Sequence, residues 1–72
     1  MDSETRERVR ALVQKASNAL QTGVDMRHAQ RAYFKTKSTD TLMASKGLER
    51  AFDTQAAEAL ALCKTLLDWN VL

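Results

Sequence analysis

Residues that interrupt helices are almost absent from this sequence. The 72 residues include no proline and only two glycines, Gly23 and Gly47. Alanine, leucine and charged or amide side chains with long aliphatic stems are frequent instead, and these residue types favour helices. The composition therefore predicts an all-α fold.

Residues that bind metals or form disulfides are equally scarce. Cys63 is the single cysteine and His28 the single histidine, so neither an internal disulfide nor a structural zinc site can be assembled from this sequence. An unpaired cysteine among leucines is typical of a reducing compartment, which predicts a cytoplasmic protein. We expect no bound metal and no cofactor.

Long apolar runs and catalytic motifs are missing as well. The first residues, MDSETRERVR, are polar and of mixed charge, unlike a signal peptide, and no apolar run is long enough to span a bilayer. The sequence has no glycine-rich phosphate loop, no HExxH zinc motif and no GxSxG nucleophile motif. We therefore expect neither an enzyme nor a membrane protein.

The chain is short enough for its size to predict association. Its 72 residues are expected to form one domain, residues 1–72. A domain of this size buries barely enough apolar surface to offset the entropy lost on folding, and it commonly relies on a disulfide, a metal ion or another subunit. Because the first two are excluded, the sequence predicts a homodimer or a higher even oligomer.

The first helix is predicted over about residues 3–22. Asp2 or Ser3 can cap its free backbone amides, and its apolar residues recur at the i, i+3, i+4, i+7 spacing of one helix face. Gly23 is expected to end it, because glycine adopts the left-handed conformation that terminates helices without steric cost.

Two further helices are predicted after Gly23. Asp25 can cap a helix over about residues 25–37. The next residues, TKSTD, favour a turn, and Ser38 or Thr39 can then cap a long helix over about residues 39–69.

The expected fold is an antiparallel helical hairpin with an extra N-terminal helix, the first two helices lying along the third. Gly47 interrupts the third helix. We interpret it as the site of a close helix crossing or a mild bend, with a hinge as the functional alternative.

Apolar residues occupy about half of the circumference of the third helix, whereas one neighbouring helix covers a stripe of about 100°. The excess predicts burial by a second chain as well, in a helical bundle. Cys63 is interpreted as a structural cysteine within this stripe. The candidate self-association face comprises Phe52, Ala59, Leu62, Cys63, Leu66 and Trp69.

Basic charge is concentrated in one segment. Residues 26–38, MRHAQRAYFKTKS, contain no acid, although the whole chain has a formal net charge of only +2. Arginine donates paired hydrogen bonds to phosphate, and an aromatic ring can stack on a base. A candidate ridge for an anion or nucleic acid comprises Arg27, Arg31, Phe34, Lys35 and Lys37. The alternative, which we favour, is that these residues pair with Glu49 and Asp53 across the hairpin.

The segment from Met26 to Asp53, MRHAQRAYFKTKSTDTLMASKGLERAFD, joins a Met-Arg-x-Ala-Gln-Arg-x-Tyr-Phe-Lys-Thr-Lys-Ser helix end to a Leu-x-x-Ser-Lys-x-Leu-Glu-Arg-x-Phe-Asp helix. It resembles small helical proteins of phages and prophage regions, which have no established activity. The resemblance implies a helical hairpin in a phage or bacterial setting, where small helical proteins often bind another macromolecule.

We therefore expect a non-enzymatic helical interaction module that self-associates and binds another macromolecule, such as a protein partner. The alternative is weak binding of nucleic acid or a phosphorylated ligand through the basic ridge.

Overall fold

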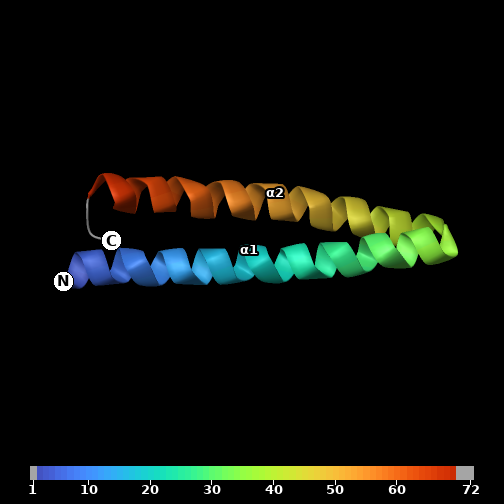
Figure 1. Cartoon of the computed structure of the whole chain (residues 1–72), viewed down its shortest axis with the longest axis horizontal. Coiled ribbons are helices and arrows are strands. Elements are labelled where there is room, and N and C mark those ends of the chain that lie inside the picture. The colour runs from blue at the N-terminus through green and yellow to red at the C-terminus, as the bar shows by residue number, and fades with distance from the viewer. Residues whose placement is uncertain (1, 70–72) are drawn as a thin grey trace.

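The chain folds into two long antiparallel helices. In the computed structural model, which describes residues 2–69, helix α1 spans Ser3–Thr36 and helix α2 spans Thr39–Asp68. They lie side by side as a rod of 51 × 15 × 13 Å (Figure 1). The start of α1 and the end of α2 form one end of the rod, the open end, and the connection forms the other, the turn end. Within the described residues, neither helix has a stretch apolar and long enough to cross a membrane.

Both helices begin at a side-chain cap, in each case the first of the two candidate residues that the sequence predicted. The Asp2 carboxylate accepts a hydrogen bond from the backbone N–H of Thr5 at 2.7 Å, and the Ser38 hydroxyl accepts one from the backbone N–H of Thr41 at 3.1 Å. The bond from Thr5 favours the ionised form and lowers the pKa of Asp2 below its ordinary value of 3.8. The cap therefore stabilises the fold fully above the ordinary pKa, and this contribution is lost as the pH falls through the lowered pKa.

The prediction of three helices is wrong, because α1 continues through Gly23 and Asp25 as one helix of 34 residues. Asp25 does not cap a new helix; its carboxylate accepts a hydrogen bond at 3.1 Å from the side chain of Gln21, one turn earlier. A glycine in a helix interior costs about 1 kcal/mol. A break would instead create two helix ends with unpaired backbone groups, so the continuous helix is favoured. The chain is all-α with a hairpin as expected, but the predicted helices over 3–22 and 25–37 are one element.

Gly23 marks the place where the two helices approach closely. A Cβ atom at this position would lie 3.0 Å from Cε1 of Phe52 on α2, whereas carbon atoms in contact are separated by about 3.5–4 Å. Around Gly47, no neighbouring atom lies within 4 Å of such a Cβ. The interpretation of Gly47 as a close crossing is therefore wrong, and that role belongs to Gly23.

The seam between the helices follows a seven-residue repeat, as in a coiled coil. On each helix, the row of residues that faces the partner helix is buried or half-buried. These rows are Thr5, Leu12, Ala19, Met26 and Tyr33 on α1, and Ser45, Phe52, Ala59 and Leu66 on α2 together with Ser38, the N-cap of α2.

Few large side chains are fully buried in this seam. The buried residues are the small side chains of Ala19, Ser45 and Ala59 together with Leu66, whose side chain is the one large side chain that is fully buried among the described residues. The hairpin alone consequently has a thin core for its length.

The connection between the helices requires one residue in an uncommon conformation. Lys37 has φ 55° and ψ 29°, in the left-handed region, and its backbone N–H donates to the carbonyl of Tyr33 at 2.6 Å. A side chain in this region costs about 1–2 kcal/mol. The Lys37 ammonium partly offsets that cost, since it lies 4.9 Å from the ring centre of Phe34 and 5.3 Å from that of Tyr33.

The two glycines provide a matched pair of substitutions. Gly47→Ala is expected to stabilise the chain by about 1 kcal/mol, because alanine favours the helix and meets no neighbour. Gly23→Ala should not give this stabilisation, because its Cβ would clash with the ring of Phe52. In a Phe52→Leu background, the two alanine substitutions should change the free energy of unfolding by the same amount. Urea unfolding followed by circular dichroism at fixed protein concentration measures all four variants. Equal stabilisation by both alanines would contradict the close approach at Gly23.

Substitutions at Lys37 separate backbone strain from ring contacts. Lys37→Ala keeps the left-handed backbone and loses the contacts with the rings, whereas Lys37→Gly loses the contacts and removes the strain. The glycine variant is expected to be more stable than the alanine variant by about 1 kcal/mol in thermal unfolding. Two variants of equal stability would argue against a strained turn.

Candidate functional site

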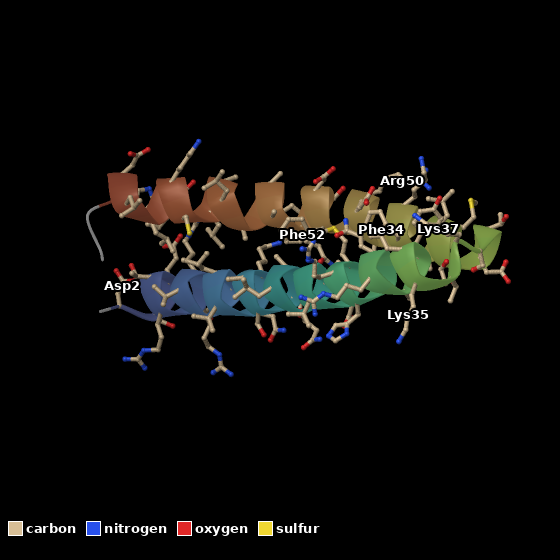
Figure 2. The ribbon with its side chains drawn as sticks, turned by 45° about the vertical axis from the view of Figure 1, so that its right-hand side comes forward. Asp2, Phe34, Lys35, Lys37, Arg50 and Phe52 are labelled. Atoms are coloured by element: carbon tan, nitrogen blue, oxygen red, sulfur yellow. The ribbon has the colours of Figure 1, made fainter. Side chains whose placement is uncertain are left out.

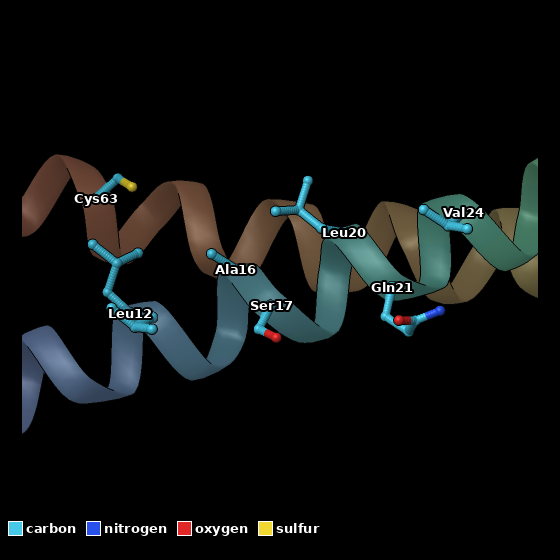
Figure 3. Close-up of a pocket in the computed structure, with 8 residues that line it drawn as sticks. Leu12, Ala16, Ser17, Leu20, Gln21, Val24 and Cys63 are labelled. Carbon is cyan, nitrogen blue, oxygen red and sulfur yellow. The ribbon is translucent and has the colours of Figure 1, made fainter.

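An open apolar groove runs along one side of the hairpin. Its volume is about 640 Å³, and Ser17 and Gln21 lie at its margin. Figure 3 shows Leu12, Leu20 and Val24 along α1, with Cys63 projecting from α2 beside them. The apolar lining consists of Leu12, Val13, Ala16, Leu20, Val24 and Cys63.

The groove extends over α2 through a second, adjoining hollow. This hollow shares Ala16, Leu20 and Cys63 with the first one, and it adds apolar side chains of α2 that include Phe52, Ala56 and Leu60. Leu67 lies four residues after Cys63 and seven after Leu60, so it continues the same side of the helix. We call this side of the hairpin the groove face.

The groove face exposes large apolar side chains. Leu20 is 70% exposed, Val13 64%, Leu67 63% and Leu60 55%. Single exposed apolar residues are ordinary, but a contiguous group on one face is typical of an interaction site. This face is thus the strongest candidate for a functional surface.

The seven-residue repeat assigns charged residues to the same face. Val13 and Leu20 share a row with Arg6, Arg27 and Phe34 on α1, and Leu60 and Leu67 share a row with Lys46 and Asp53 on α2. Outside these two rows lie the basic edges of the groove face, formed by Arg10 and Arg31 on α1 and by Arg50 and Lys64 on α2.

The face of the hairpin opposite the groove is acidic. An ion pair of 3.5 Å between Lys15 and Glu58 joins the helices there, and the guanidinium of Arg8 lies 4.3 Å from the ring centre of Trp69. The repeat assigns most of the acidic residues to this side: Glu4, Glu7, Asp25, Asp40, Glu58 and Asp68. The small net charge of the chain therefore conceals a basic groove face and an acidic opposite face.

Toward the turn end, the groove face becomes polar. The side-chain amide of Gln30 donates to the carboxylate of Glu49 at 3.0 Å, and the buried hydroxyl of Ser45 donates to the same oxygen at 3.3 Å. Arg27 donates to the side-chain carbonyl of Gln30 at 3.3 Å. The bond from Gln30 to Glu49 links α1 to α2, and the three bonds together separate the apolar groove from the turn.

The residues of the predicted basic ridge divide between the two faces. Arg27 and Phe34 lie on the groove face and Arg31 lies on its edge, whereas Lys35 points away from α2 (Figure 2). Lys37 lies in the turn against the ring of Phe34, which is 67% exposed.

No cross-seam ion pair forms at the predicted ridge. Within residues 2–69 the ion pairs are Arg8–Glu4 and Lys15–Glu58, so the favoured alternative of pairing with Glu49 and Asp53 is wrong. The carboxylate of Glu49 instead accepts a hydrogen bond across the seam from the side-chain amide of Gln30. Lys46 and Arg50 of α2 lie on the groove face with Arg27, and sequence reasoning missed both.

The predicted self-association face lies mainly in the intramolecular seam. Leu66 is fully buried, Ala59 is buried, and Phe52 packs against Gly23. Leu62 is half-buried, Trp69 contacts Arg8, and Cys63 is half-buried beside the groove. The exposed groove residues that sequence reasoning missed are Val13, Leu20, Val24, Leu60 and Leu67. Their signal was the seven-residue spacing of Val13 with Leu20 and of Leu60 with Leu67.

Side chains that could ligate a metal ion are dispersed along the described part of the hairpin. Among the described residues, no group of three or more His, Cys, Asp or Glu side chains could hold a metal ion. His28 is exposed on α1.

Comparisons with known proteins add no relationship. No family model matches the chain, and neither the curated proteins nor the solved structures contain a match.

The link between Gln30 and Glu49 can be tested by a double-mutant cycle. Glu49→Ala removes the acceptor of Gln30 and of buried Ser45, and we expect it to destabilise the hairpin by about 1–2 kcal/mol. Gln30→Ala in the Glu49→Ala background should then cost less than Gln30→Ala alone. Urea unfolding measures the cycle, and strictly additive losses would indicate that the two side chains are not coupled.

Proposed function

We propose that this chain is a non-enzymatic helical interaction module that docks another helix on its groove face. The observation that supports this is a contrast within residues 2–69: the seam has one fully buried large side chain, whereas the neighbouring face has several exposed ones. A partner that covers the groove would complete a core that the hairpin lacks.

The energetic gain from such docking is large relative to the stability of a small domain. Complete burial of an exposed valine or leucine contributes at most about 1.5–3 kcal/mol, and the groove face offers Val13, Leu20, Leu60 and Leu67. Domains are stable by only about 5–15 kcal/mol in total. The apolar burial that the groove offers is therefore comparable with the stability of a small domain, and part of it offsets the entropy lost on association.

Self-association is the second candidate, and the thin core favours it. Two copies packed through their groove faces would form a four-helix bundle, either a homodimer or part of a higher even oligomer. This arrangement would also bring the basic edges of the two copies together, and such like-charge contacts oppose association. We therefore rank docking of a different helix above self-association.

A cytoplasmic, phage or bacterial setting also belongs to this proposal. The half-buried single cysteine beside apolar side chains supports a reducing compartment. The resemblance of residues 26–53 to phage and prophage proteins supports the setting, where a small chain can act by binding a macromolecule.

If the groove is a docking site, substitutions in it should abolish the binding of apolar ligands without affecting the folding of the chain. Replacing both Leu20 and Leu60 with glutamine should leave the helix content and melting temperature of the isolated chain nearly unchanged, because these side chains are exposed. The same variant should lose most of its binding of Nile red, a neutral dye that fluoresces in apolar surroundings. Circular dichroism and dye titration measure the two effects.

A control variant with substitutions on the opposite face shows whether the loss of dye binding is specific to the groove. Replacing exposed Ala11 and Ala51 with glutamine should leave dye binding unchanged. Equal dye binding by the groove variant and the parent would contradict a docking role for the groove. A parallel drop in melting temperature and sedimentation coefficient for the groove variant would support self-association instead.

A further inference from the structure

We propose that the groove receives an amphipathic helix with acidic flanks. This inference rests on the proposed docking function and specifies the chemistry of the partner. Its basis is that the seven-residue repeat places cationic residues outside the apolar rows of both helices.

The groove is shaped to accept a single helix. Its floor contains the small side chains of Ala16, Ala56 and Cys63, while Leu20 on α1 and Leu60 on α2 line its sides. Small residues on the floor allow another backbone to approach, and the larger side chains flank it. An apolar stripe with leucine-like residues at i, i+3 and i+7 would complete a three-helix bundle.

The charges beside the groove indicate which residues should flank the apolar stripe of the docked helix. Arg10 lies three residues before Val13 on α1, and Lys64 lies four residues after Leu60 on α2, so a cation stands outside each apolar row. Long basic side chains at such positions pair with acidic residues that flank an apolar stripe, as at the edges of a coiled coil. A helix with glutamates beside its apolar stripe would meet cations on both sides.

A second copy of the chain fits this surface less well. Its groove face is basic, and its acidic face lacks a row of large apolar side chains. The outer rows of that acidic face are Glu4, Ala11, Asn18, Asp25 and Ala32 on α1, and Ala44, Ala51, Glu58 and Thr65 on α2. The acidic face of a second copy therefore has the charge that fits the groove but lacks the apolar stripe. Its groove face has the apolar stripe but carries the wrong charge.

A nucleic acid also fits less well. Its phosphates would meet the basic edges, but the exposed valines and leucines between those edges offer no contact that a phosphate backbone or a base requires. Phe34 is the exposed aromatic ring on the groove face, and it lies near the turn.

The test uses two designed peptides of about three heptads, each with leucine at the a and d positions. One peptide carries glutamate at the flanking e and g positions and the other carries lysine. Binding of each fluorescently labelled peptide to the full chain is measured by anisotropy. We expect the glutamate peptide to bind at least about tenfold more tightly, and its affinity to fall as salt rises from about 0.05 M to 0.5 M.

Three variants of the chain assign the binding to the groove and its edges. The Leu20→Gln, Leu60→Gln variant should lose binding of the glutamate peptide. The Arg10→Gln, Lys64→Gln variant should lose the preference for glutamate over lysine. Lys35→Gln, which removes one positive charge from the side of α1 turned away from the groove, should keep that preference.

The other outcomes overturn the inference in distinguishable ways. Equal binding of both peptides would retain docking and reject an acidic partner. Binding of neither peptide by a chain that sediments as a dimer would identify a second copy as the occupant. Tighter binding of a single-stranded oligonucleotide than of the glutamate peptide would favour nucleic acid. A monomeric chain that binds none of these probes would reject the proposed function itself.

Discussion

The close packing of α1 against α2, at Gly23 and at the small buried residues of the seam, is the constraint on which the other features depend. At Gly23 the ring of Phe52 occupies the space that a Cβ would need, and buried Ala19 and Ala59 continue the same seam. Small side chains let two helices approach closely, but they bury little apolar surface per residue. The hairpin thus gains its geometry from these residues and leaves much of the stabilisation to other contacts.

The apolar side chains that the seam does not bury are gathered on one face. Because both helices follow a seven-residue repeat, the row of Val13 and Leu20 on α1 comes beside the row of Leu60 and Leu67 on α2, with the groove between them. The polar link of Gln30 with Glu49 and Ser45 ends this apolar zone toward the turn. A buried polar group has to keep its partner, so this link also disfavours other registers of the two helices.

Because basic and acidic residues lie on different faces, the groove face can distinguish between partners by their charge, which apolar contacts alone cannot do. Exposed ion pairs contribute little to the stability of a fold, but the sign of charge around an interface influences which partners approach and in which orientation. With basic edges beside the groove and acids on the far side, the hairpin can discriminate between helices of similar hydrophobicity.

The helical character and the chain reversal follow from the sequence alone. The absence of proline, the caps at Asp2 and Ser38 and the polar turn are local signals, and each acts within a few residues of its own position. The fate of Gly23 was decided by the tertiary structure, because a glycine ends a helix or passes through it according to what packs opposite. The groove face was decided in the same way. Residues far apart in sequence, such as Leu20 and Leu60, share a surface only once the register of the two helices is set, and that register depends on contacts made across the whole seam.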